Sequence, residues 1–337
     1  MNKKLMFLSA PALMLGFPLI AASCNLTNKT EQEAKYNEDK TELLQIGFKD
    51  GKIEAIATTV KKVPTKLPKE ITSLENAFKD NINDTIEGLD QWDTSNIENM
   101  DGVFFGAKKF NQDLSKWTTS KVKSMKSMFD TANEFNQDIS GWDVSKVENM
   151  DFLFIRASKF NQNISGWKTD SLTSMRGIFK EASEFNQELK DWKVDNVTDM
   201  ASAFNGAKKF DKEIGSWNVE KVTDMSNMFQ NTDVFNSDIK NWKVSSVTKM
   251  NNMFEKALKF NQDIKDWNTS NVTTMKSMFA GAKDFNQDLT KWNVDKVTDH
   301  KYFNKDGKSD WSNIPTKFKT TLGTGPSTPA PAAPKAK

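Results

Sequence analysis

The sequence contains very few of the residues on which most catalytic and redox sites depend. Its 337 residues include one cysteine and one histidine. With the single cysteine Cys24, no disulfide can form within the chain. Cys24 and His300 form no nucleophile–base pattern, and no phosphate-binding loop is present. We therefore predict that the protein is not an enzyme and that it uses no cofactor.

Arginine is also scarce. The formal net charge is +2, and nearly all of the positive charge is lysine, because arginine occurs only as Arg156 and Arg176. Proteins that read nucleic acids rely on arginine for bidentate contacts to bases and phosphates. The composition therefore predicts no nucleic-acid partner.

What the sequence has in abundance is a repeat of 25 residues. Phenylalanine and methionine columns keep this period, as Phe135, Met150 and Phe154 illustrate. A constant period over nine copies indicates a solenoid, in which each copy buries its apolar face against its neighbours. The period is clearest in nine of the ten tryptophans: Trp92, Trp117, Trp142, Trp167, Trp192, Trp217, Trp242, Trp267 and Trp292.

The spacing of apolar residues within one copy predicts two elements. Ile139, Trp142 and Val144 have the spacing of a leucine-rich repeat strand. The residues that follow have offsets that place them on one face of a helix: Val147, Met150, Leu153, Phe154 and Ala157. We therefore predict an α/β repeat solenoid. It is a leucine-rich-repeat-like stack of short parallel strands on one face and short helices on the other, with an N-terminal β-hairpin cap.

The N-terminal residues predict an anchor in the membrane. A basic start and a short apolar run lead to small residues directly before Cys24, a pattern that resembles a bacterial lipobox. The resemblance implies cleavage before Cys24 and attachment of diacylglyceryl to its sulfur. The protein would then be lipid-anchored at the extracellular face of the cell membrane. An ordinary signal peptide with an incidental cysteine is the alternative.

Changes of composition divide the rest of the chain. Asp50-Gly51 between two apolar-rich runs is a hairpin signal, and Trp311 and Ile314 lie off register, as expected of a terminal cap. The predicted order is a lipoprotein signal peptide (1–23), a flexible tether (24–41), an N-terminal hairpin cap (42–69), 25-residue leucine-rich-like repeats (70–303), a C-terminal cap (304–319) and a disordered Pro/Ala-rich tail (320–337).

The copies from Phe110 onward carry a Phe-Asn-Gln-Asp box or a variant of it, so that asparagines and aspartates form columns. We expect the asparagine side chains to satisfy backbone groups in the tight turn after each predicted helix. Calcium bridging by stacked aspartates is the alternative. The column lacks glycine-rich turns and is interrupted by Asn163, Glu188 and Glu213, so we predict no metal site.

The repeat resembles a known family. The sequence VTDMSNMF at 222–229, together with 135–144, is typical of mycoplasma surface lipoproteins with BspA-like leucine-rich repeats, also called PARCEL repeats. The resemblance covers 70–303. It implies a lipid-anchored protein on the outer face of a wall-less bacterium, with a role in host contact or antigenic variation. The family has no known catalytic residues.

The candidate site lies beside the tryptophans. In a leucine-rich geometry, the residues between the inward positions of the strand line an open face, and here they vary from copy to copy. We predict that this face binds a host or surface protein, in addition to the contact of the diacylglyceryl anchor with the membrane. A structural or antigenically variable coat lipoprotein with no specific ligand is the alternative. The candidate residues are Asp143, Lys168, Lys193, Asn218, Lys243, Asn268, Asp170, Asp195 and Glu220.

Overall fold

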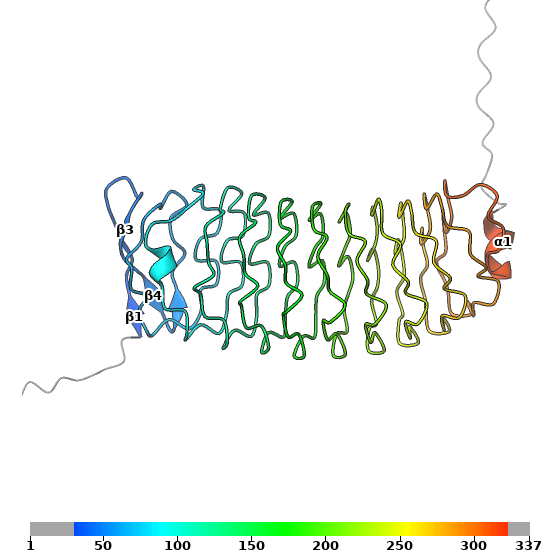
Figure 1. Cartoon of the computed structure of the whole chain (residues 1–337), viewed down its shortest axis with the longest axis horizontal. Coiled ribbons are helices and arrows are strands. Elements are labelled where there is room, and N and C mark those ends of the chain that lie inside the picture. Colours follow the sequence, from blue (N-terminus) through cyan, green and yellow to red (C-terminus); the bar gives the residue numbers. More distant parts are fainter. Residues whose placement is uncertain (1–29, 323–337) are drawn as a thin grey trace, which may run out of the picture.

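The computed structural model describes residues 30–322, which form an elongated stack of coils (Figure 1). A small β-rich cap lies at the N-terminal end of the stack and a short helix at the C-terminal end. The predicted signal peptide, Cys24 and most of the predicted tail lie outside the described residues. No helix within 30–322 is long and apolar enough to cross a membrane.

The N-terminal cap is built around the Asp-Gly hairpin. Strands β4 (Phe48–Lys49) and β5 (Lys52–Ile53) pair antiparallel through this turn, in which Asp50 and Gly51 have φ values of 48° and 79°. Two consecutive positive φ angles are the requirement of a type I′ turn, which explains the Asp-Gly pair. The hairpin indicated by the sequence is therefore present.

Part of the predicted tether is folded onto this cap. Strand β1 (Glu31–Gln32) adds to β4 in a three-stranded antiparallel sheet. Strand β2 (Lys35–Tyr36) pairs with β3 (Leu43–Gln45). Residues 31–36 thus belong to the cap, because their backbone groups complete two sheets.

The predicted fold class is wrong in its secondary structure. Within 30–322 the only helices are the 3₁₀ helix η1 (Leu89–Gln91) and α1 (Thr316–Leu322), and neither belongs to a repeating helical layer. No strand forms at 139–144. Parallel pairing is reduced to one bridge per coil, which lies seven residues after each tryptophan of the column. These positions are Asn99, Ser124, Asn149, Ser174, Asp199, Asp224, Lys249, Thr274 and Asp299, and Ser73 pairs with Asn99 in the coil before Trp92.

A chain of tight turns replaces the predicted helix. Alternate N–H groups donate to carbonyls of the next coil at 2.8–3.0 Å: those of Met125, Ser127, Phe129 and Thr131. The N–H groups between them donate within the coil, to carbonyls three residues back: those of Met128, Asp130 and Ala132. Because this alternation satisfies the backbone without bonds four residues back, the segment gains nothing from becoming an α-helix.

Two left-handed residues per coil make these turns possible. In the coil after Trp117 they are Ser127 and Thr131, with φ values of 54° and 62°. Glycine takes the equivalent position in several coils, for example Gly177 and Gly206. A left-handed residue interrupts an α-helix, so the apolar spacing of this segment reflects successive turns and not a helical face.

The core is a continuous stack of aromatic rings. Phe129 lies 5.7 Å from both Phe104 and Phe154 in the neighbouring coils, and 3.9 Å from Phe135 in its own. All of these rings are fully buried. Their burial and stacking supply the main stabilisation of each coil.

The C-terminal end is closed by aromatic residues. Trp311 packs edge-on against Phe279 and Phe285, and Phe318 of α1 stacks on the imidazole of His300 at 4.3 Å between ring centroids. Lys317 Nζ donates to carbonyls of the last tryptophan coil. These contacts cover an end that would otherwise expose core rings to water.

Candidate interaction face

Two faces of the stack differ in how their coils are joined. We define the Trp face as the surface formed in each coil by the two residues before the tryptophan and the four after it, which are 165–171 in the coil of Trp167. We define the turn face as the surface formed by the tight turns, which are 174–182 in the same coil. All nine predicted site residues are exposed and lie on the Trp face.

These nine residues form two parallel columns. One column follows the tryptophan directly and contains Asp143, Lys168, Lys193, Asn218, Lys243 and Asn268. The other follows two residues later and contains Asp170, Asp195 and Glu220. Between the columns the chain buries a valine or threonine, such as Val194 or Thr169. Because burial alternates along the chain, the two flanking side chains project to the same side.

The tryptophans support this face from below. Their side chains are only 2–4% exposed. Each indole N–H donates to a carbonyl of the preceding coil, as Trp167 Nε1 does to Ile139 O at 3.2 Å. The tryptophans therefore cannot stack on a ligand, and their role is to hold consecutive coils together.

Other side chains also bridge the coils of the Trp face. Thr169 Oγ1 donates to the carbonyl of Lys193 at 2.9 Å and accepts from its N–H at 2.8 Å. Within the described coils from Trp92 to Trp292, no backbone–backbone hydrogen bond joins neighbouring coils on this face. The Trp face is thus held together by side chains, whereas the turn face is held together by backbone.

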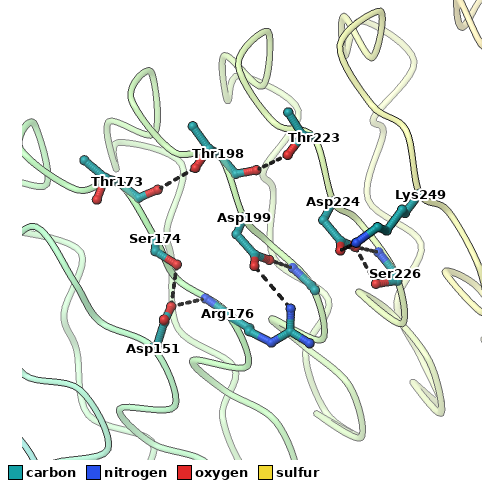
Figure 2. A network of polar contacts seen from close by, with 11 residues as sticks. Asp151, Thr173, Ser174, Arg176, Thr198, Asp199, Thr223, Asp224, Ser226 and Lys249 are labelled. Atoms are coloured by element: carbon teal, nitrogen blue, oxygen red, sulfur yellow. Dashed lines mark hydrogen bonds and ion pairs between the residues drawn. The ribbon is translucent and has the colours of Figure 1, made fainter. Parts of the chain in front are cut away.

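Charged side chains of the turn face also form hydrogen bonds and ion pairs with residues of neighbouring coils (Figure 2). Asp151 Oδ1 accepts hydrogen bonds from Ser174 Oγ and from the N–H of Arg176 in the next coil. The Arg176 guanidinium continues to Asp199 Oδ2 at 3.2 Å, and Lys249 Nζ lies 3.1 Å from Asp224 Oδ2. These charges connect coils, whereas the exposed ammonium groups of Lys126, Lys256 and Lys276 on the same face form no ion pair within 30–322.

At the edge of the turn face, threonine hydroxyls form a ladder. Thr198 Oγ1 donates to the Thr173 carbonyl and Thr223 Oγ1 to the Thr198 carbonyl, as Figure 2 shows. Each of these hydroxyls bonds to the preceding coil, so the ladder is also part of the scaffold.

On the Trp face, some charged side chains form an ion pair or hydrogen bond with a neighbouring coil and others do not. Lys243 Nζ lies 2.8 Å from Glu220 Oε1, and Asn218 Nδ2 donates to Asp195 Oδ1 at 2.9 Å. In contrast, the ammonium groups of Lys168 and Lys193 make no ion pair or hydrogen bond to any other residue within 30–322.

The carboxylates of Asp143 and Asp170 also differ in whether another residue of the described chain contacts them. The Asp170 carboxylate has no such contact within 30–322. Asp143 Oδ1 accepts the N–H of Ser145 at 3.0 Å, and hydrogen bonding from the Ser145 side chain and N–H lowers the pKa of this carboxyl. Asp143 is therefore a turn-stabilising residue, while Asp170 is free for an external contact.

Two open depressions lie side by side on the Trp face. One has a volume of about 370 Å³ and is lined by residues of the Trp217 and Trp242 coils. The other, of about 300 Å³, is lined by residues of the Trp192 and Trp217 coils. Ser216 and Asn218 form the ridge that both share.

Sequence reasoning did not identify several of the lining residues, including Lys190, Asp191 and Gly215. Gly215 lies two residues before Trp217, at a position where the other coils from Trp117 to Trp292 have serine, lysine or threonine. A Cβ atom at this position would lie 2.1 Å from the carbonyl oxygen of Asp238, so only glycine fits. This departure from the repeat was the signal that could have revealed the depression.

The asparagine column satisfies backbone groups between coils and not within one turn. Asn111 Oδ1 accepts the N–H of Asn136 at 2.9 Å, and Gln137 Nε2 donates to the Asn111 carbonyl. The expected local contact is therefore corrected to a ladder that runs along the stack. It joins coils where the backbone alone does not.

The aspartate column stabilises turns. Asp138 Oδ1 accepts the N–H of Ser140 at 2.9 Å, and this hydrogen bond lowers the pKa of the carboxyl. Across 30–322, no group of three or more histidine, cysteine or acidic side chains is placed to hold a metal ion. The geometry of the column is accounted for by turn formation.

Comparisons with known proteins give one family model and two solved chains that match this sequence. A family model described as "Mycoplasma protein of unknown function, DUF285" matches three overlapping stretches, 72–187, 162–248 and 212–317. No curated protein matches the sequence. Two chains of solved structures match. One is a leucine-rich repeat protein from Bacteroides ovatus ATCC 8483, with 13% identity, a TM-score of 0.30, and coverage of 84% of this chain and 79% of that chain.

Proposed function

Because the chain belongs to the family described as Mycoplasma protein of unknown function, DUF285, we propose that it is an interaction module and that its Trp face contacts a protein partner. One observation carries this proposal. The Trp face presents exposed charged groups in adjacent coils, those of Lys168, Lys193 and Asp170, that form no ion pair or hydrogen bond within 30–322.

The scaffold suits such a role. The buried tryptophans and the aromatic core hold the exposed columns in place, so a partner would meet side chains on a preorganised surface. The two depressions that share Asn218 make this surface concave in places. Recognition would then depend on residues that differ from coil to coil, while the constant residues maintain the stack.

We further propose that Cys24 carries a diacylglyceryl anchor, which would place the solenoid at the extracellular face of the cell membrane. The support is the sequence before Cys24, with its basic start, short apolar run and small residues. One acyl chain binds membranes only marginally, whereas two hold stably. Metabolic labelling with a palmitate analogue tests this anchor. Label that persists in Cys24→Ser would disprove it.

A binding experiment tests the Trp face. The triple variant Lys168→Glu, Lys193→Glu, Lys243→Glu reverses its exposed lysines. A matched control makes the same charge change on the turn face, at Lys126, Lys256 and Lys276, which are also exposed. Each protein is immobilised and exposed to purified extracellular-matrix proteins and to host-cell membrane extract. We expect at least tenfold weaker binding for the first variant and little change for the control.

The second candidate is a coat lipoprotein without a specific ligand. The observation that favours it is the contrast between constant buried columns and variable exposed ones, which antigenic variation alone would also produce. Absence of any specific binding by the unmodified protein in the same experiment would favour this candidate. Equal binding by both triple variants would instead remove the Trp face as the site.

A further inference from the structure

We propose that the Trp face pairs with the Trp face of a second copy of this chain, side by side and parallel, through the coils of Trp167 and Trp192. This inference rests on the proposed role of the Trp face as a contact surface and names a partner for it. Three features favour this pairing: charged groups without an ion pair, their order within each coil, and the common period of two identical solenoids.

The charges of the two coils have the same order. Lys168 precedes Asp170 in one coil, and Lys193 precedes Asp195 in the next. All four side chains are exposed. Within 30–322, none of the four takes part in an ion pair, and Asp195 accepts only the side-chain amide of Asn218. Elsewhere charges pair readily between coils, as Lys243 does with Glu220.

A twofold axis parallel to the stack, running above the buried Thr169 and Val194, makes this order self-complementary. Rotation about the axis exchanges the two columns and keeps the direction of the coils. The basic column of one copy then lies opposite the acidic column of the other, at the same coil. Lys168 meets Asp170 of the second copy, Lys193 meets Asp195, and each contact occurs twice because the interface is isologous.

An antiparallel pair through the same two coils lacks this complementarity. A twofold axis perpendicular to the stack, but in the plane of contact, lays each column on itself. With that axis between the coils of Trp167 and Trp192, Lys168 would face Lys193 of the second copy, and Asp170 would face Asp195. Like charges opposite one another are unfavourable, so the charge order selects the parallel pair.

Because both copies have the same period, charges that lie opposite one another at one coil also do so at the next. Two copies have the same rise per coil, so a pair formed at Trp167 is in register at Trp192.

The expected association is weak and sensitive to salt. Exposed ion pairs contribute little individually and are screened at high ionic strength. Anchoring of copies on one surface would raise their effective concentration and favour the pair. A parallel pair also keeps both N-termini at the same end of the complex.

A zero-length carbodiimide cross-linker tests the contact directly, since it joins only amines and carboxylates that touch. The full chain is reconstituted in phosphatidylcholine vesicles as an equal mixture of unlabelled and ¹⁵N-labelled protein. We expect mixed-isotope peptides that join Lys193 to Asp195 and Lys168 to Asp170. Cross-linked dimer should fall at least fivefold when the ionic strength is raised to about 1 M, where the Debye length is about 3 Å.

Charge exchange provides the matched variants. The acidic variant is Lys168→Asp with Lys193→Asp, and the basic variant is Asp170→Lys with Asp195→Lys. We expect each alone to give at least tenfold less dimer than the unmodified chain, and their equal mixture to restore it. A control with Lys126→Asp and Lys276→Asp on the turn face should dimerise normally.

Three results would overturn the inference: no mixed-isotope peptide from the unmodified chain, undiminished dimer from the acidic variant, or a mixture no better than its components. Failure of this inference is distinguishable from failure of the proposed function. If the lysine variants lose an external partner while the unmodified chain stays monomeric, only the inference fails. If dimers form while no external protein binds, the inference stands without the host contact.

Discussion

The turn face and the Trp face belong to the same coils, yet they are stabilised in different ways. On the turn face, backbone N–H groups from consecutive turns donate to the next coil, as Phe129 does to the Leu153 carbonyl at 2.9 Å. On the Trp face, coils are joined through indole, hydroxyl and amide side chains, as Trp192 Nε1 is to the Ile164 carbonyl. Neighbouring coils are therefore joined by the backbone on the turn face and by particular side chains on the Trp face.

This difference explains where the molecule can carry variable residues. Backbone hydrogen bonds tolerate most side chains, but the turn face needs left-handed residues and uses several of its charges between coils. The Trp face needs only its buried tryptophan, its valine or threonine and its isoleucine or leucine. Its exposed positions are consequently free to change, which is why the candidate site is found there and not on the turn face.

The largest expected effect comes from removing a ring that both faces share. Phe179 is fully buried and lies 5.8 Å from Phe154, 5.6 Å from Phe204 and 3.9 Å from Phe185. Phe179→Ala should lower the free energy of unfolding by about 3–5 kcal/mol. Urea denaturation followed by tryptophan fluorescence measures the loss. A change below about 1 kcal/mol would show that the aromatic stack does not support the coils as described.

A smaller loss is expected from a change confined to the Trp face. Trp167→Phe keeps an aromatic ring but leaves the Ile139 carbonyl without its indole donor. That carbonyl still accepts the N–H of Trp142 at 3.1 Å, so the expected loss is that of one hydrogen bond, about 0.5–1.5 kcal/mol. The same urea experiment applies. If Trp167→Phe has no effect, side chains do not join the coils on this face, and the contrast between the two faces is lost.

A gain in stability is expected from a change confined to the turn face. Thr131 is β-branched and has a φ of 62°, a conformation that costs a non-glycine residue about 1–2 kcal/mol. Thr131→Gly should therefore stabilise the chain by about 1 kcal/mol. Lys126→Gly is the control, because Lys126 lies in the same turns without a positive φ, and it should destabilise. Equal effects of the two substitutions would contradict the left-handed turns.

The smallest effect is expected where the turn face ends. His300 occupies the methionine column, and burial, with the nearby Lys317 ammonium, lowers its pKa, while Asp299 acts in the opposite direction. An unfolded histidine titrates near pH 6.5. The stability due to neutral His300 is therefore complete above about pH 6.5 and is lost as the pH falls through the lower folded pKa.

His300→Met should remove this pH dependence. Thermal unfolding by circular dichroism at pH 7 and pH 5 measures it, and we expect the midpoint of the unmodified chain to fall by about 1 °C more than that of the variant. An identical decrease in both proteins would exclude His300 as the cause.

Several elements of this protein could be read from the sequence. The period of the tryptophans predicted a solenoid, and the apolar columns predicted the core, including Phe154 and Met150, which are both fully buried. The nine candidate residues were correctly placed outside the core, because alternation about Val194 or Thr169 is a local property. The depression at Gly215 was missed, since it depends on how closely Asp238 of the next coil approaches.

The predicted helices failed for a physical reason. Apolar offsets of three, four and seven residues fit both a helix and a chain of tight turns, because each reverses direction about every three to four residues. The glycines at 102, 177 and 206 and the asparagines at 227 and 231 were local evidence for left-handed residues. They were outweighed by the hydrophobic pattern.

The sequence by itself determined the period, the buried columns and the exposed residues beside each tryptophan, because these depend on side-chain polarity along one chain. Only the tertiary structure decided where the backbone hydrogen bonds go and which charges remain unbound. Those partners lie in the neighbouring coil, and no local pattern states whether an N–H group will bond within its own turn or across to the next one. In this protein the N–H groups at alternate positions of the turn face donate to the next coil, so no helix forms there. The exposed side chains of the Trp face remain available for contact with a partner.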